Sequence, residues 1–302
     1  MTEKITSARL TEHELSEIRA LIEQRSGILF DESRERFFSQ RVREHLEEKR
    51  LPHGADLLRL MRNSNVEYDS LLERLLTQET SFFRYPSVFE ALERKVLREM
   101  HTKKFWENPR SLRVWSAGCA TGEEPYTIAM TICDSLEFAE AWNIHILATD
   151  VSRQALQVAE RGVYPARELS ALNPRQKEAY FTKVGTEFMV RPKLRNLVSF
   201  AQMNLAQSVY MGCFDIIFCM NVMIYFSEDR RASLIQRFYE YLEPGGYLFV
   251  GHAESVAKAG VRFESSVYGD CILYHKPIVP QARKEAAAVA TGSTAASGGE
   301  KA

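Results

Sequence analysis

Apolar residues in the first hundred positions recur at the spacing of one helix face. The first series, at residues 15–22, follows a T-E-H-E capping box at residues 11–14. A second helix is predicted over residues 31–50, where Pro52 follows its end. Further sets at helical spacing lie at residues 57–61, 71–76 and 88–97. No β-type alternation interrupts them, so we expect an all-helical N-terminal domain with its linker over residues 1–85.

The pattern changes at Leu112, where short continuous apolar runs begin to alternate with helical stretches. Such alternation is typical of a parallel sheet that carries helices on both faces. The apolar runs are LRVWSA, IHILATD, LVSFAQMN, FDIIFCMN, YLFVGH and CILYHK. Before the fifth run, EPGG at residues 243–246 is expected to end a helix. We therefore expect an α/β domain over residues 86–276.

Two segments depart from this pattern. Between residues 161 and 200 the chain is longer than a strand-to-strand crossover needs, and YFTKVGTEFMVRP predicts a short hairpin that turns at Gly185. Beyond Pro277 the chain consists mainly of Ala, Gly, Ser and Lys. Such a composition buries too little apolar surface to fold, so residues 277–302 are predicted to be a disordered tail.

Composition narrows the class of protein. The chain has 302 residues, 45% of them hydrophobic, and a net charge of −1. This balance argues against a dedicated nucleic-acid binder, which usually carries a strong basic excess. The five cysteines form no C-x-x-C pair and the seven histidines show no metal-ligand spacing, so we expect reduced thiols and no metal. With no apolar run long enough to span a bilayer and no signal peptide, we expect a cytoplasmic protein.

A turn with the sequence AGCATG links a predicted strand to a helix that begins near Glu123. Gly118 and Gly122 have no side chain and would let a ligand approach the backbone, at the strand ends where open α/β sheets bind ligands. The spacing matches neither G-x-G-x-x-G nor a P-loop, and Glu123 with Glu124 would repel a pyrophosphate. A ligand with a positive centre, such as S-adenosylmethionine, fits better. Alternatively, the glycines only let the strand pack against the helix.

Another acidic residue, Asp150, ends the next predicted strand. There it is placed to accept hydrogen bonds from both hydroxyls of a ribose. Alternatively, it caps the helix that follows directly. Together with the glycine turn, Asp150 suggests the sheet of a class I methyltransferase.

Five motifs, in this order and spacing, resemble the chemotaxis receptor glutamate methyltransferases, the CheR family. They are TSFFR at 80–84, WSAGCATGEEPYTIA at 115–129, ATD at 148–150, NVMIYF at 221–226 and LEPGGYLFVGHAES at 242–255. The resemblance extends from about Leu10 to Lys276, and WSA-x-x-x-TGEEPY together with NVMIYF is highly specific. It implies an all-helical N-terminal domain, then a class I, Rossmann-like, seven-stranded methyltransferase domain with a small inserted β-subdomain at residues 161–200.

The resemblance also implies a reaction and a set of site residues. The family transfers the methyl group of S-adenosylmethionine to glutamate side chains of chemoreceptors and leaves S-adenosylhomocysteine. Arg84 and Tyr225 match its active-site positions, with Tyr225 near the methyl group. At Gln78 the family usually has Asn. The positions that match its cofactor contacts are Gln78, Thr80, Arg84, Gly118, Glu123, Asp150, Asn204, Leu205, Asn221 and Val222.

Carboxylate methylation agrees with what the sequence offers. A glutamate side chain has a pKa near ~4.3 and is already an anionic nucleophile at neutral pH, so no general base is needed. Arg84 can hold a carboxylate in its planar fork, and the Tyr225 hydroxyl can orient the incoming carboxylate or stabilise the transferring methyl. Alternatively, Tyr225 is a core aromatic residue, as we expect Phe226 to be. The N/D-P-P-Y/F motif of amine methyltransferases is absent, which argues against an amine acceptor.

The second predicted helix carries a candidate docking face. Arg36, Arg43 and Arg50 recur every seven residues and would share one face. The acidic helices of chemoreceptors could dock there, as the resemblance implies. Alternatively, this is an ordinary solvated face, because the helix also carries several glutamates, and RNA binding is a third alternative.

Other functions and partners stay open at this point. The same fold could methylate another protein carboxylate, or serve as a non-catalytic S-adenosylmethionine-binding scaffold. A scaffold need not keep Arg84, Asp150 and Tyr225 together. In some family members the β-subdomain captures a pentapeptide at the receptor C-terminus, but the turn here is short, so we expect no such tether. We also expect a monomer without membrane insertion.

Overall fold

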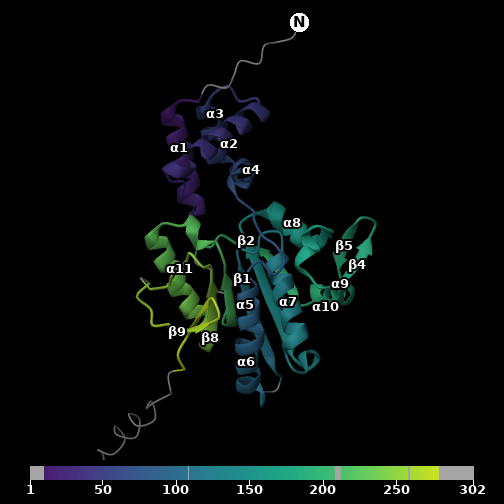
Figure 1. Ribbon diagram of the computed structural model, residues 1–302. Coiled ribbons are helices and arrows are strands. Elements are labelled where there is room, and N and C mark those ends of the chain that lie inside the picture. Colours follow the sequence, from purple (N-terminus) through teal and green to yellow (C-terminus); the bar gives the residue numbers. More distant parts are fainter. Residues whose placement is uncertain (1–9, 108, 208–211, 258, 279–302) are drawn as a thin grey trace, which may run out of the picture.

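The computed structural model describes residues 10–107, 109–207, 212–257 and 259–278, and its helical N-terminal part lies at one end of a sheet domain (Figure 1). The helices of this part are α1 (Glu12–Ser26), α2 (Glu35–Glu48), α3 (Gly54–Asn63) and α4 (Asn65–Leu75). The predicted capping box is confirmed, because Thr11 Oγ1 accepts the Glu14 N–H at 3.2 Å and Glu14 Oε2 accepts the Thr11 N–H at 2.8 Å. The four apolar faces meet in one buried core, which includes Ile18, Ile22, Phe38, Val42, Leu57, Met61 and Leu71.

The second helix is shorter than predicted. A 3-10 turn at Glu32–Arg34 precedes α2, and α2 ends at Glu48. Beyond it, Arg50 has φ = 54°, and the N–H groups of Arg50 and Leu51 donate back to carbonyls of the last turn, the Schellman pattern of helix ends. Arg50 therefore lies outside the helix, and the prediction that it shares a helix face with the other two arginines is wrong.

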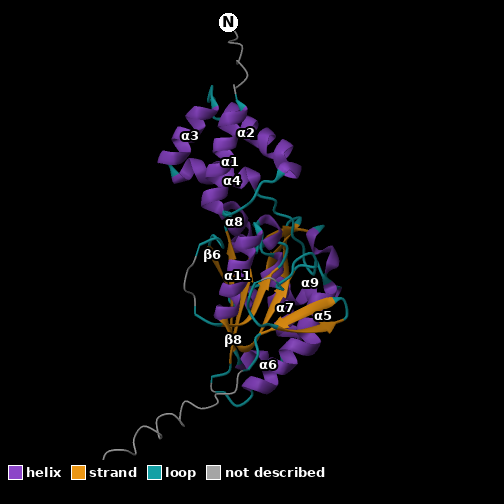
Figure 2. Ribbon diagram, turned by 90° about the vertical axis from the view of Figure 1, so that its left-hand side faces the viewer, coloured by secondary structure: helices purple, strands orange, loops and turns teal. Residues whose placement is uncertain are grey.

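Seven strands form one sheet, which confirms the predicted fold class (Figure 2). They are β1 (Ser111–Ala117), β2 (Asn143–Asp150), β6 (Val198–Gln202), β7 (Phe214–Cys219), β8 (Leu242–Val250), β9 (Glu264–Tyr268) and β10 (Cys271–His275). Their order across the sheet is β6-β2-β1-β7-β8-β10-β9. The first five in that order are parallel, and β10 is antiparallel to both β8 and β9. The chain reverses its direction of progress between β1 and β7, where open α/β sheets bind their ligands.

Helices cover both faces of this sheet. Along β1, Val114 joins the core beneath α5 to α7, whereas its neighbour Trp115 packs on the opposite face against α11. Strands covered on both faces need apolar residues throughout, which explains the continuous apolar runs. The covering elements are α5 (Pro86–Ala91), a π-helical turn (Leu92–Val96), α6 (Leu97–Lys104), α7 (Glu123–Ser135), α8 (Arg153–Arg161) and α11 (Glu228–Tyr241).

Two strands differ from the sequence prediction. β8 begins at Leu242 and takes in EPGG, because Leu242 already pairs with Phe214 before the register shifts. β9 is not among the predicted strands, since its residues, ESSVY, lie at the exposed edge of the sheet and form no apolar run.

The insertion forms a small sheet of its own, with the order β3-β5-β4. Its elements are β3 (Val163–Pro165), α9 (Pro174–Tyr180), β4 (Phe181–Val184), β5 (Glu187–Val190) and α10 (Pro192–Arg195). The predicted hairpin is present and turns at Gly185, where φ is 62°. Residues 279–302 of the predicted tail lie outside the described residues. Among the described helices, none combines the length and the apolar character that crossing a bilayer requires.

Candidate functional site

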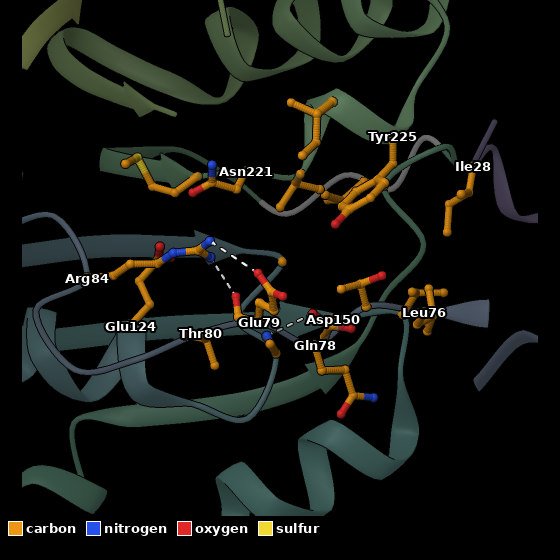
Figure 3. A pocket seen from close by; sticks show the side chains of 18 of the residues that line it. Ile28, Leu76, Gln78, Glu79, Thr80, Arg84, Glu124, Asp150, Asn221 and Tyr225 are labelled. Carbon is orange, nitrogen blue, oxygen red and sulfur yellow. Dashed lines mark hydrogen bonds and ion pairs between the residues drawn. The ribbon is translucent and has the colours of Figure 1, made fainter. Parts of the chain in front are cut away.

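A cavity of about 220 Å³ opens between the helical part and the sheet, where β1, β2 and β7 end (Figure 3). A water molecule occupies about 30 Å³ of liquid, so this volume suits a small organic molecule better than a single ion. The end of α1 contributes Ser26, the loop that follows it contributes Ile28, and the linker contributes residues between 76 and 85. The predicted site residues that line the cavity are Gln78, Thr80, Arg84, Gly118, Asp150, Asn204, Leu205, Asn221, Val222 and Tyr225.

The two glycines after β1 have different roles. The Gly118 N–H donates to the Thr149 carbonyl at 2.8 Å, which ties the turn to β2. Gly118 has φ = 89°, and a Cβ there would lie 2.3 Å from Val222 Cγ2, so glycine is needed for the β7 loop to come this close. At Gly122, with φ = 98°, a Cβ would lie 2.7 Å from Cβ of Ala159 in α8. Gly118 therefore borders the cavity, whereas Gly122 serves helix packing.

Asp150 lies at the end of β2 and borders the cavity (Figure 3). Its Oδ2 accepts the Ala120 N–H at 2.9 Å, and its Oδ1 accepts the Ser152 N–H at 2.8 Å. The cap of α8 is the Ser152 hydroxyl, which accepts the Ala155 N–H at 2.9 Å. Burial raises the pKa of the Asp150 carboxyl, and the N–H bonds oppose that shift. The helix-capping alternative therefore belongs to Ser152, and Asp150 can accept hydrogen bonds from the cavity.

The two glutamates that open α7 lie in different surroundings. Glu123 is 3% exposed and lies outside the cavity lining, with its carboxylate bonded to the Thr121 hydroxyl at 2.7 Å. Glu124 lines the cavity instead and accepts the Ser116 hydroxyl at 2.6 Å. Successive helix residues point about 100° apart, so Glu124 faces the cavity and Glu123 does not. Burial raises the pKa of Glu124 to about 7.

The linker before α5 places Arg84 across the cavity from Tyr225 (Figure 3). Arg84 Nη1 donates to the Glu79 carbonyl at 2.6 Å, and Nη2 lies 3.9 Å from the Glu79 carboxylate. Because the Glu79 side chain is 81% exposed, this ion pair is weak and can exchange for another carboxylate. Gln78 Nε2 donates to the hydroxyl that caps α8, at 2.9 Å. Phe82, 1% exposed, anchors the linker in the core of the sheet domain.

The loop after β7 carries Tyr225 and is tied to the helical part. The Tyr225 carbonyl accepts the Leu29 N–H at 2.7 Å, and Ile28 forms an antiparallel bridge with Phe226. Phe226 is buried, as predicted, whereas the Tyr225 ring borders the cavity. Asn221 has φ = 61°, a left-handed conformation that few residues other than glycine adopt. The helical part therefore helps to hold the tyrosine in place.

The wall beyond β6 is formed by Asn204 and Leu205. Asn204 Nδ2 donates to the Arg25 carbonyl at 2.8 Å, and its Oδ1 accepts the Ala206 N–H at 2.8 Å. Leu205 is 8% exposed and adds an apolar surface. The Asn204 side chain thus joins the helical part to this wall.

The arginines near α2 divide into two groups. Arg36 and Arg43 are exposed on α2 and do not line the cavity. Arg34, in the turn before α2, has its guanidinium 5.1 Å from the centroid of the Tyr225 ring, a cation–π distance. Its Nη1 is buried without a hydrogen-bond partner among the described residues. The contact of Arg34 with Tyr225 depends on the turn before α2, which packs against the loop after β7.

The cavity lining combines acidic groups with a basic group. Asp150 suits hydroxyl donors, Glu124 suits an ammonium group, and Arg84 suits a carboxylate. S-adenosylmethionine carries all of these groups, so the residues present fit this cofactor. Among the described residues, no group of three or more His, Cys, Asp or Glu is arranged to hold a metal ion.

Comparisons with known proteins show what this chain is similar to. A family model described as "CheR methyltransferase, SAM binding domain" matches residues 78–268. The chemotaxis protein methyltransferase of Escherichia coli (strain K12) is 36% identical over 274 residues, which cover 87% of this chain and 90% of that protein. That of Borreliella burgdorferi is 32% identical over 253 residues, or 82% of this chain and 89% of that protein. A solved magnesium protoporphyrin IX methyltransferase from Synechocystis with bound SAM is 16% identical, with a TM-score of 0.33 over 63% of this chain and 78% of that one.

Proposed function

Because the chain belongs to the CheR methyltransferase family, we propose that it transfers the methyl group of S-adenosylmethionine to glutamate side chains of chemoreceptors. The observation that carries this proposal is the charge pattern of the cavity. Asp150, Glu124 and Arg84 all line it, and they come from three different segments of the chain. A scaffold without activity would not require Arg84 and Tyr225 to face one another across the cofactor cavity.

The ribose, the ammonium group and the adenosine of the cofactor would each have a matching group in the cavity. Asp150 would accept the ribose hydroxyls, and Glu124 would hold the ammonium group. The polar and apolar residues that would enclose the adenosine are Asn204, Leu205, Asn221 and Val222. Gln78 and Thr80, which belong to the linker, would cover the bound cofactor. When bound, S-adenosylmethionine supplies an electrophilic methyl carbon.

The protein's own contribution to the reaction is positioning. The acceptor glutamate is already ionised at neutral pH, so no side chain has to remove a proton. Arg84 would exchange its loose contact with Glu79 for the acceptor carboxylate, and the Tyr225 hydroxyl would donate a hydrogen bond that orients the attacking oxygen. Such positioning can contribute up to roughly 7–11 kcal/mol to the barrier.

Carboxyl methylation can be tested directly. Purified protein is incubated with methyl-labelled S-adenosylmethionine and chemoreceptor-containing membranes from its own host, and the label is then released in mild alkali. Base-labile label on a receptor-sized band supports the proposal. Tight binding of the cofactor without transfer to any receptor would refute the choice of acceptor.

Two exposed arginines of α2, Arg36 and Arg43, are proposed to dock the acidic receptor helices. Arg43→Glu should raise KM for the receptor about tenfold and leave the Kd of S-adenosylhomocysteine unchanged, since the residue lies outside the cavity. Arg94→Glu is a matched control, because Arg94 is also exposed and pairs only loosely, 3.3 Å from Glu90 on its own helix. An equal rise in KM for both variants would indicate a general charge effect instead of a docking face.

We further propose that recognition does not use a receptor C-terminal pentapeptide and that the protein acts as a monomer. The hairpin that would present such a peptide has only residues 185 and 186 between β4 and β5. Calorimetric titration with the pentapeptide should show no heat of binding. Micromolar binding would contradict the proposal, and light scattering would test the monomer.

A further inference from the structure

The GHAES segment after β8 places a buried carboxylate, which the proposed function does not use, against the loop after β7 that lines the cavity. Glu254 is 8% exposed and accepts three backbone N–H groups. Its Oε2 accepts those of Gly251 at 2.7 Å and Asn221 at 3.1 Å, and its Oε1 accepts that of Ile224 at 3.1 Å. A buried carboxylate is costly unless hydrogen bonds satisfy its oxygens, and here both oxygens are satisfied by the main chain.

This carboxylate joins the ends of two neighbouring strands. Gly251 follows β8, whereas Asn221 and Ile224 belong to the loop that follows β7. A Cβ at Gly251 would lie 2.7 Å from Glu254 Oε2 and 3.0 Å from the Asn221 nitrogen, so the glycine makes room for the carboxylate. Burial raises the pKa of Glu254, and the backbone N–H groups oppose that shift.

The loop held in this way contains the residues that border the cavity. Asn221 keeps its left-handed backbone, with φ = 61°, while its N–H is bonded to Glu254. Ile224 lies in the 3-10 turn Met223–Tyr225, directly before the tyrosine. The Tyr225 N–H donates within this turn, to the Val222 carbonyl at 3.2 Å. The direction of the Tyr225 side chain therefore depends on a turn that Glu254 fixes.

We propose that Glu254 is a positioning residue for methyl transfer, which sets the Met223–Tyr225 turn through the Ile224 N–H and so aims the Tyr225 hydroxyl into the cavity. It makes no contact with substrate or cofactor itself. This inference rests on the proposed function for the role of Tyr225, but the geometry of the loop can be measured without it.

Glu254→Gln separates the three hydrogen bonds. An amide has one oxygen, and its NH2 group cannot accept. If the amide oxygen points to the N–H groups of Gly251 and Asn221, two hydrogen bonds remain. In the opposite orientation only the Ile224 bond remains. The variant therefore loses the Ile224 bond and retains the other two, so the tyrosine turn loosens while the cofactor wall stays in place.

The kinetic test is a double-mutant cycle with Tyr225→Phe. Glu254→Gln alone should lower kcat about tenfold, since the Ile224 N–H loses the acceptor that fixes the tyrosine turn, and should change the Kd of S-adenosylhomocysteine less than about twofold. In the Tyr225→Phe background, the same change should lower kcat less than about twofold, because no hydroxyl is left to aim. Equal factors in both backgrounds, or parallel losses of affinity and kcat, would overturn the proposal.

Hydrogen–deuterium exchange tests the same inference without any receptor. Glu254→Gln should speed exchange in peptides covering residues 220–226 and leave those covering β2 unchanged. Asp215→Asn is a control for the loss of a buried carboxylate elsewhere, because Asp215 lies at the opposite end of β7, where it accepts the Arg113 N–H at 2.9 Å and pairs with Lys104 at 2.8 Å. The control should affect residues near 113 and not 220–226. Unchanged exchange at 220–226 in Glu254→Gln would refute the positioning role even if no methyl acceptor were found.

Discussion

Glu124 is predicted to lower the stability of the ligand-free protein at neutral pH. Its carboxylate borders the cavity and accepts the Ser116 hydroxyl at 2.6 Å. Burial raises its pKa from 4.5 to about 7, and the nearby Glu254 carboxylate adds to the shift. An ionised group in such a place is tolerated where a cationic ligand is meant to bind.

The sign and size of the effect follow from linkage. Between pH 4.5 and 7 the folded state keeps the proton on Glu124 and the unfolded state has released it, so the free energy of unfolding falls as the pH rises. A shift of this size corresponds to at most about 3 kcal/mol. Water in the open cavity screens the carboxylate and makes the loss smaller.

The perturbation that tests this is Glu124→Gln. The amide oxygen still accepts the Ser116 hydroxyl, but nothing ionises. Compared with the wild type, the variant should be about equally stable at pH 5 and more stable at pH 8, by up to about 3 kcal/mol. At the same time it should bind S-adenosylhomocysteine at least about tenfold more weakly, because a charge-assisted hydrogen bond to the ammonium group is lost.

Urea unfolding at pH 5 and pH 8 measures the free energy of unfolding of each protein. Calorimetric titration with S-adenosylhomocysteine at both pH values measures its affinity. Wild-type affinity should rise with pH up to about 7 as Glu124 ionises, and the variant should show no such rise. A variant that is destabilised equally at both pH values would show that Glu124 acts through packing. A variant that keeps full cofactor affinity would show that another residue holds the ammonium group.

Three further variants test other parts of the cavity. Asp150→Ala should weaken S-adenosylhomocysteine binding about 10- to 100-fold by calorimetry, because two ribose hydroxyls and the Ala120 N–H lose an acceptor. Tyr225→Phe should keep that affinity within about twofold and lower kcat at least about tenfold in the labelled-methyl assay, and equal losses of both would contradict its role. Gly118→Ala should lower the free energy of unfolding by more than about 1 kcal/mol in urea and abolish cofactor binding, since its Cβ would lie 2.3 Å from Val222 Cγ2.

The parts of the site that could be predicted from sequence are those fixed by strand ends. Asp150 ends one apolar run and Tyr225 lies in the loop that follows another, so the sheet topology brings both to one edge. Which of Glu123 and Glu124 faces the ligand depends on the rotation of α7, and no apolar pattern in TGEEPY sets that rotation. The resemblance to the family motif therefore indicates Glu123, whereas its neighbour Glu124 is the residue that lines the cavity.

Contacts between distant segments could not be predicted in this way. A repeat of seven residues placed Arg50 on the face of α2, but the left-handed residue that ends the helix is an arginine, and glycine is the usual marker of such an end. Arg34 reaches Tyr225 only because the α1–α2 loop pairs with the loop after β7. The GHAES motif indicated a resemblance, while the role of Glu254 became visible only from its three backbone partners.

Two backbone contacts limit how this protein can be divided into separate parts. They are the bridge between Ile28 and Phe226 and the hydrogen bond from the Leu29 N–H to the Tyr225 carbonyl. A chain cut between the helices and the sheet would lose one wall of its own cavity, so the helical part is not an adaptor that can be exchanged freely. A chimera of two relatives would have to take residues 26–34 and 221–226 from the same parent. The two segments therefore have to be exchanged together, although nearly two hundred residues separate them along the chain.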